Sequence, residues 1–335
     1  MAHLLPKEKR QAVQRFNVLA KDYGRTRAKV MVAEEYGVST ASVDKWRNSH
    51  QPEPITSSDF EYKVEAPQYI PVERIEEGER ILEVVASDIH YPYQDAAGYE
   101  LFVKVVTDLQ PNILVLLGDI MDCYAVSAHD KDANRGTPAA FKEELVYART
   151  KLGELRDRLP NTRIIYKEGN HETRLSRYIS KNAAVLSNIA ALTLPELLSL
   201  NELKIEWIPN DGRLRIGKMW HIHGNEIGGS GMSPARLKYT RMQCNFIFGH
   251  HHQRDKFRPR AYDGSQHGAY ANPCLCDLEP EYAHHTHNWS LGFTIIDHDT
   301  DGTFQVEEIE IVKPSTRARI AKCNVRGQIY EVDIS

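Results

Sequence analysis

Runs of apolar residues that end in polar ones alternate with amphipathic segments through the middle of the chain. Residues 80–90, 112–119 and 162–172 each contain a run of aliphatic side chains followed by polar residues that include Asp, Asn or His, which is typical of strands followed by a polar turn. Residues 96–110 and 141–159 instead show helical spacing of their apolar side chains. The alternation predicts an α/β layered domain with polar residues gathered at the carboxyl edge of a sheet.

Beyond residue 204 the apolar runs become shorter, and we find no internal repeat. They lie at residues 204–208, 214–224, 244–252, 291–297 and 304–312. These runs predict a second sheet, mostly antiparallel, that packs on the first.

The first fifty residues follow a different pattern. Residues 7–23 predict a helix, a second helix is expected up to Tyr36, and Gly37 breaks it before a third that Ser39 or Thr40 caps. This order predicts a small all-α helix-turn-helix domain, similar to the trihelical DNA-binding domains of transposase-like and phage proteins. The alternative is a three-helix cap whose charges are only solvated.

The third helix of this domain offers the candidate DNA contacts. Val43 and Trp46 would face inward, whereas Ser42, Lys45 and Arg47 would face outward. We therefore expect these three outward residues to contact nucleic acid.

Charge divides in the same way. Of the net charge of −4, residues 1–50 carry ten basic and five acidic residues, or +5, which leaves −9 for the remainder. Residues 49–68 are rich in Pro, Ser and acidic side chains and predict a linker. We expect a basic domain at 1–50, a linker at 51–79 and a catalytic domain at 80–335.

Composition narrows the class of protein. The hydrophobic content of 41% and charged content of 26% are those of a soluble globular protein. Lys7 precedes any apolar run and no stretch approaches the ~20 apolar residues of a membrane helix, so we expect neither a secretory signal nor a membrane partner. Five cysteines indicate reduced thiols in a cytoplasm, and the C-x-C pair Cys274 and Cys276 is weak evidence for zinc.

Residue types that bind metals follow five of the apolar runs. They are Asp88 and His90, Asp119 and Asp122, Asn170 and His171, His221 and His223, and His250 and His252. In this order they match the DxH, GDxxD, GNH[E/D], H and GHxH pattern of the calcineurin-like metallophosphoesterase superfamily, which the chain resembles from residue 80 to about 312. The stretches "GDIMDCYAVSAHDK", "GNHETRL" and "NWSLGF" are most similar to bacteriophage phosphoesterases. The resemblance implies a β-sandwich flanked by helices and, for a phage protein, the host cytoplasm.

This resemblance also implies two divalent metal ions, which hydrolyse a phosphate ester with a bridging hydroxide and bear charge on the phosphoryl oxygens. One ion would be held by Asp88, His90, Asp119 and His252. The other would be held by Asp119, Asn170, His223 and His250. Mixed imidazole and carboxylate ligands favour Mn²⁺, with Fe, Zn, Ni or Mg as alternatives.

Other roles follow from the same resemblance. His171 would face the leaving-group oxygen as a proton donor, and Asp122 would orient it. Phosphoprotein phosphatases of the superfamily carry arginine where Cys123 stands, which disfavours that class. Arg174 either pairs with Glu172 or reaches a phosphate, and we favour the pairing.

The remaining histidines have weaker interpretations. His221 is either a donor that supports the ligands or a structural histidine, and His251 is the spacer of GHxH and should point away. The polar cluster at His284, His285 and His287 predicts a loop.

Three functions remain open from the sequence. The chain is expected to be a phosphodiesterase or nuclease that its basic domain brings to DNA, and a basic strip after the last ligand turn would contact the substrate. That strip consists of Arg254, Lys256, Arg258 and Arg260. The alternatives are a phosphoesterase for small or broad substrates, and a DNA-binding regulator with an inactive metal site.

Overall fold

The computed structural model describes residues 6–49, 68–70, 80–128, 137–228, 232–260, 262, 264–280 and 287–335. Its contacts divide the chain into two compact units, residues 1–64 and 65–335. Most of the expected linker, together with His284 and His285, lies outside the described residues. No helix in the described parts of the chain combines the length and apolar character that crossing a membrane requires.

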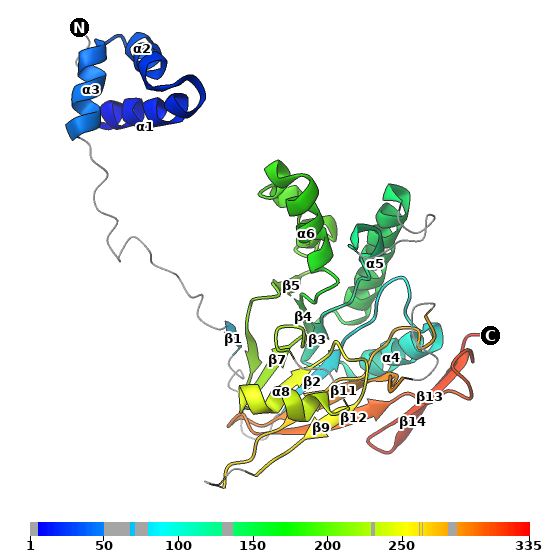
Figure 1. The fold of residues 1–335 in the computed structure, drawn as a ribbon. Coiled ribbons are helices and arrows are strands. Elements are labelled where there is room, and N and C mark those ends of the chain that lie inside the picture. The colour runs from blue at the N-terminus through cyan, green and yellow to red at the C-terminus, as the bar shows by residue number, and fades with distance from the viewer. Residues whose placement is uncertain are drawn as a thin grey trace. The chain divides into compact units, whose positions relative to one another are not determined.

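The smaller unit consists of three helices over the predicted residues (Figure 1). They are α1 (Pro6–Tyr23), α2 (Arg25–Glu35) and α3 (Thr40–Ser49). Phe16, Val32 and Val43 lie in its buried core, one from each helix. The amide of Ser42 donates to Ser39 Oγ at 3.2 Å, so Ser39 supplies the cap of α3.

The larger unit contains two six-stranded sheets and a C-terminal hairpin. One sheet has the strand order β1 (Gln68–Ile70), β6 (Leu214–Ile216), β7 (Met219–Ile222), β8 (Phe246–Phe248), β10 (Ala269–Ala271) and β9 (Asp255–Phe257). The other has the order β12 (Phe304–Glu310), β11 (Gly292–His298), β2 (Ile81–Ala86), β3 (Ile113–Leu117), β4 (Arg163–Lys167) and β5 (Ile205–Ile208). The hairpin pairs β13 (Ile320–Val325) with β14 (Gln328–Asp333).

Helices flank this sandwich, which confirms the predicted fold class. They are α4 (Ala96–Leu109), α5 (Pro138–Arg158), α6 (Thr173–Asn182), α7 (Leu194–Leu197) and α8 (Pro234–Met242), with single 3₁₀ turns η1 (Tyr124–Val126), η2 (Ala184–Leu186) and η3 (Ala190–Leu192). Val115 of β3 packs toward Ile216 and Ile247 between the sheets. The opposite face of the β3 sheet packs on α4 and α5, and the outer face of the β8 sheet packs on α8.

Two sequence-based expectations about the sheets were wrong. The second sheet is not mostly antiparallel, because β1–β6, β7–β8 and β8–β10 are parallel pairs. The segment between β7 and β8 contains α8, which provides the long crossover that a parallel pair needs. The runs at 204–208, 291–297 and 304–312 join the β3 sheet as β5, β11 and β12, because strand partners depend on distant contacts. The expected linker also contains β1, which pairs with β6.

Candidate metal centre

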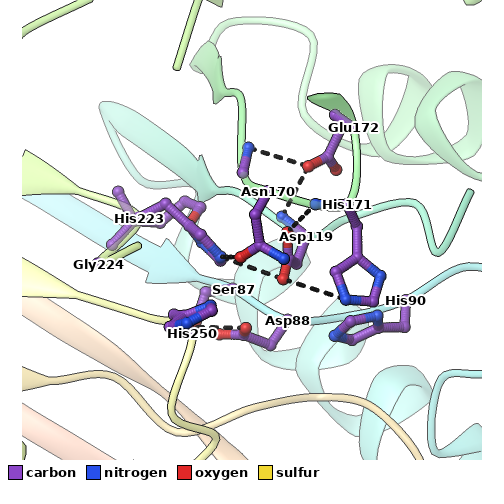
Figure 2. Close-up of polar contacts among 12 residues, drawn as sticks. Ser87, Asp88, His90, Asp119, Asn170, His171, Glu172, His223, Gly224 and His250 are labelled. Atoms are coloured by element: carbon purple, nitrogen blue, oxygen red, sulfur yellow. Dashed lines mark hydrogen bonds and ion pairs between the residues drawn. The ribbon is translucent and has the colours of Figure 1, made fainter. Parts of the chain in front are cut away.

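Five polar turns meet where β2, β3, β4, β7 and β8 end. The first three strands are parallel neighbours in one sheet, and β7 and β8 are parallel neighbours in the other. Carboxyl ends of parallel strands meet at one sheet edge, so turns far apart in sequence come together. Figure 2 shows side chains from these turns pointing toward one another.

Two groups of ligand atoms share Asp119. The ligand atoms of Asp88, His90 and Asp119 lie within 4.8 Å of one another, and so do those of Asp119, His223 and His250. His223 Nε2 is 3.1 Å from Asp119 Oδ2. The two groups correspond to the two ligand sets that the sequence resemblance implied.

The two other expected ligands join these groups. Asn170 Oδ1 is 3.2 Å from His223 Nε2, and Figure 2 shows the amide directed at that ring. His252 Nε2 is 3.2 Å from Asp88 Oδ1 and 3.3 Å from His90 Nε2. The structure therefore brings all seven expected ligands to one centre.

The backbone at the centre is unusual. Asp88, His90, Asp119, His250 and His252 have φ values of 52°, 56°, 51°, 69° and 57°. Residues other than glycine adopt this left-handed conformation rarely, at a cost of order 1–2 kcal/mol each. Such strain persists where function requires a side-chain direction that a relaxed turn would not give.

Glycines next to the ligands allow close approach as well as turning. Gly118 has φ 85°, as expected for a sharp turn. At Gly249 the requirement is space, because a Cβ there would lie 2.6 Å from Asp88 Oδ2. Any side chain at residue 249 would displace a ligand carboxylate.

The ionisation of Asp88 and His250 suits a divalent cation, whereas His223 would have to lose a proton to bind one. Burial would lower the pKa of His223, but Asp119 raises it to about 10. Burial would raise the pKa of Asp88, but neighbouring His252 lowers it to about 2, so the carboxylate is charged. Burial and the charge of His223 lower the pKa of His250 to about 4, which leaves a neutral imidazole with a lone pair to share. His90 Nε2 and His252 Nε2 also converge on one point. Neutral imidazoles and charged carboxylates are the donors that transition metals prefer.

His171 and Asp122 form a pair beside the ligands. His171 Nδ1 lies 3.0 Å from both Asp122 Oδ1 and the Asp122 carbonyl oxygen. Because both partners are acceptors, Nδ1 carries the proton, and His171 Nε2 accepts from Arg174 Nη2 at 2.9 Å. Asp122 also lies 3.1 Å from His90 Nδ1. Burial would raise the pKa of Asp122, but its bonds to His171 and His90 hold the pKa well below its usual range.

The favoured pairing of Arg174 with Glu172 is wrong. Arg174 Nη1 instead donates to the Asp122 carbonyl oxygen at 2.8 Å. The Glu172 carboxylate instead accepts from the backbone amides of residues 119–121 and Gly169, and from the Tyr166 hydroxyl. Figure 2 shows the Glu172 carboxylate beside Asp119. Sequence reasoning missed this role, since a glutamate after GNH gives no sign of which donors it meets.

Two further groups near the ligands were also missed. Cys276 Sγ is buried 3.7 Å from His252 Nδ1, on the side of the ring away from Asp88. Glu144 of α5 accepts a hydrogen bond from the amide of Cys123, and burial raises the pKa of Glu144 to about 8. Cys123 itself is fully buried, so its side chain cannot grip a phosphate as the arginine of phosphoprotein phosphatases would.

His221, His251 and His298 lie outside the ligand groups. His221 Nε2 is 2.5 Å from Glu83 Oε1, and His298 Nε2 is 2.6 Å from Glu83 Oε2, so the three residues form a buried bridge between the two sheets. This favours the structural interpretation of His221. The ring of His251 packs edge-on against Phe248 with centroids 5.9 Å apart, as expected for the spacer.

Acidic residues of β12 lie beside the basic strip that was expected to contact DNA. On β9 and its flank, Arg254 pairs with Glu310 at 2.9 Å and Lys256 lies 3.8 Å from Glu308. The side chain of Arg258 forms a hydrogen bond with Tyr270 of β10. The acidic residues of β12 therefore partly neutralise the positive charge of the strip. At its end, the backbone of Arg260 forms an isolated antiparallel β-bridge with that of Gln266.

On α3 the three expected contacts differ in exposure. Lys45 is exposed. Ser42 Oγ lies 2.9 Å from Ser39 Oγ, and the guanidinium of Arg47 stacks over the Phe16 ring at 5.3 Å. Lys45 is thus the residue of the three that is best placed for an external ligand.

No family model matches the chain. It is similar to the Gene 54 proteins of Mycobacterium phages L5 and D29, with 23% and 26% identity over 261 and 268 residues, covering 74% of this chain and 98% of each relative. Among solved structures it is similar to zinc-bound Vps29 from Entamoeba histolytica (TM-score 0.38, 13% identity, 76% of this chain and 99% of that chain). It is also similar to a dimetal phosphatase from Danio rerio (TM-score 0.34, 12% identity, 77% of this chain and 100% of that chain). Both of these relatives are phage proteins.

Proposed function

We propose that the chain is a metal-dependent phosphoesterase of the calcineurin-like type that acts on phosphodiesters in nucleic acid. The observation that carries this proposal is the position of Asp119, whose carboxylate belongs to two ligand groups built from separate turns. A carboxylate has two oxygens and can serve two cations, which an imidazole cannot. Two adjacent cation sites suit phosphoryl transfer to water, because bound cations can activate the water and bear charge on the attacking and leaving oxygens.

Each ligand group would hold one divalent cation. Asp88, His90 and His252 would complete one site with Asp119, and Asn170, His223 and His250 would complete the other. Bound ions would supply an activated water and neutralise charge on the phosphoryl oxygens. The imidazole-rich donor set favours Mn²⁺, with Fe, Zn, Ni or Mg as alternatives.

The chain's own acid would be His171. Its Nδ1 proton is fixed on Asp122, which orients the ring and leaves Nε2 directed toward the ligand groups, 3.7 Å from Asp119 Oδ2. To act as an acid, the ring would have to carry a second proton on Nε2, the atom that accepts from Arg174 here, and a leaving-group oxygen would receive that proton. Arg174, already within hydrogen-bond distance of Nε2, would donate to a phosphoryl oxygen that displaced it.

Nucleic acid is proposed as the substrate because the chain attaches a basic three-helix unit to an acidic catalytic body. Exposed Lys45 of α3 would contact a phosphate. Replacing Lys45 by Ala in the full chain should weaken DNA binding uniformly across sequences and reduce the salt slope by about 1.

The test is a Mn²⁺-dependent hydrolysis assay with the full chain on single-stranded DNA, duplex DNA, a simple diester and a simple monoester. We expect the DNA substrates and the simple diester to be hydrolysed, and we expect Asn170→Ala to reduce the rate on each of them. Hydrolysis of the monoester alone would favour the small-substrate phosphoesterase and refute the nucleic-acid proposal. No hydrolysis of any ester, with DNA binding intact, would favour the regulator with an inactive site.

A further inference from the structure

Helix α6 begins two residues after His171 and presents a stripe of cations around one aromatic ring. Arg174, Arg177, Tyr178 and Lys181 occupy positions i, i+3, i+4 and i+7, which lie on one face of a helix. Arg177 and Lys181 are exposed, and Tyr178 is 45% exposed. Four residues that can contact a polyanion therefore share one face.

The other side of α6 fixes this orientation. Leu175 is 7% exposed, and Leu175 and Ile179 line a groove of about 330 Å³ together with Trp207. Because Leu175 is buried and Ile179 is partly buried there, α6 cannot rotate without exposing them. The stripe must face away from the groove.

Electrostatics also favour an anionic ligand on this face. From residue 173 to 195 the chain has three cations and no Asp or Glu, although the body as a whole is acidic. Within the described parts of the chain, neither Arg177 nor Lys181 forms an ion pair. The strip at 254–260 differs, since Arg254 and Lys256 lie beside glutamates of β12.

The stripe is continuous with the candidate metal centre. Its first member, Arg174, donates to His171 Nε2 and to the Asp122 carbonyl oxygen. From there to Lys181 the helix rises about 10 Å, at 1.5 Å per residue. Figure 1 shows α6 standing beyond the end of β4, away from the sheets. A chain of phosphates cut at the centre would have its neighbouring nucleotides beside this face.

We propose that the α6 stripe binds a single strand of nucleic acid next to the scissile phosphate, with Arg177 and Lys181 on phosphates and Tyr178 stacked on a base. Cations interleaved with an aromatic ring are the combination that binds single strands without sequence preference. Duplex bases are stacked on one another and cannot use Tyr178 in this way. The inference rests on the proposed function for the position of the scissile phosphate.

The test compares Arg177→Gln/Lys181→Gln with a matched control, Arg319→Gln/Lys322→Gln, which removes two cations at β13. Binding of a labelled oligonucleotide is measured in EDTA, and hydrolysis of the same oligonucleotide and of a simple diester is measured with Mn²⁺. The α6 variant should bind the oligonucleotide at least tenfold more weakly, with a salt slope reduced by about 1.4 for two phosphate contacts on a single strand. Its rate on the simple diester should stay within twofold of the wild type, as should all values for the control.

The aromatic contribution is tested separately. Tyr178→Ala should weaken single-strand binding roughly five- to hundredfold, and Tyr178→Phe should restore it, because stacking needs the ring and not the hydroxyl. Unchanged oligonucleotide binding in the α6 variant would overturn the inference. An equal loss on duplex DNA, or an equal loss in the control, would overturn it too. Loss of binding in a chain that hydrolyses no ester would leave the inference standing while the proposed function fails.

Discussion

The carboxylate of Glu172 organises two of the ligand turns, and Glu172→Gln tests its contribution. Oε2 accepts from the amides of Asp119 and Gly169 at 3.0 and 2.9 Å. Oε1 accepts from the amides of Ile120 and Met121 at 2.7 and 3.0 Å, and from a tyrosine hydroxyl at 2.8 Å. The Glu172 carboxylate is the acceptor for all five donors. Its side chain is 1% exposed, so water cannot take its place as the acceptor.

An amide cannot satisfy these donors in either orientation. Its NH₂ group would face at least two backbone N–H groups and leave both without an acceptor. Hydrogen bonds to a charged acceptor contribute about 1.5–3 kcal/mol each, so losing two of them in a buried site corresponds to about 3–6 kcal/mol. Displacing the turn that carries Asp119 should also weaken metal binding about 10–100-fold, as the loss of a group that orients a ligand usually does.

Urea denaturation in EDTA, followed by tryptophan fluorescence, measures the free energy of unfolding. Three of the four tryptophans lie in the larger unit, which makes this signal suitable. Glu196→Gln, an exposed position on α7, is the matched control and should change the free energy of unfolding by less than about 0.5 kcal/mol. A loss below about 1 kcal/mol in Glu172→Gln, or unchanged Mn²⁺ affinity by calorimetry, would refute the role given to this carboxylate.

Three other measurements test the centre and the core. His250→Gly should be more stable than His250→Ala by about 0.5–1 kcal/mol in EDTA. A φ of 69° costs Ala about 1–2 kcal/mol, and the extra chain entropy that Gly loses on folding offsets part of this difference. Equal denaturation midpoints for the two variants would contradict the strain. His171→Gln should lower the turnover number about 10²–10⁴-fold with Mn²⁺ affinity within threefold of the wild type, whereas a parallel loss of affinity would make it a ligand. Burial would raise the pKa of Glu83, but His221 and His298 lower it from 4.5 to about 2. Ionised Glu83 therefore contributes about 3 kcal/mol to the free energy of unfolding above pH 4.5, and this contribution is lost as the pH falls through 2. Acid denaturation of wild type and Glu83→Gln should therefore converge at low pH, and parallel curves would contradict the ion-pair role.

The donor atoms of the centre were predictable because their signal is local. Each of β2, β3 and β4 is followed within three residues by Asp88, Asp119 or Asn170, and parallel strands place such turns at one edge. The helices α4 and α5 were predictable for the same reason, from the periodicity of their own residues.

The pairing of strands within the sheets was not predictable, because it depends on contacts between segments that are distant in the sequence. Nothing in residues 204–208 indicates that β5 pairs with β4 and not with β6. The same limit applies to side chains at the centre. Arg174 and Glu172 are two residues apart in a segment that turns into α6, and only the fold shows that Glu172 meets backbone amides while Arg174 meets His171.

The side chains of the three consecutive histidines at residues 250–252 lie in different directions, and the backbone conformation explains how. Alternation along an extended strand places residues 250 and 252 on one side and residue 251 on the other. The segment is not a strand, however: β8 ends at Phe248, and His250 and His252 both have left-handed backbones. Each of these two turns directs its imidazole to a different ligand group, while His251 packs on Phe248. The directions of the two side chains therefore depend on strained backbone, which the rest of the fold must offset, and at residue 250 glycine should relieve that strain where alanine would keep it.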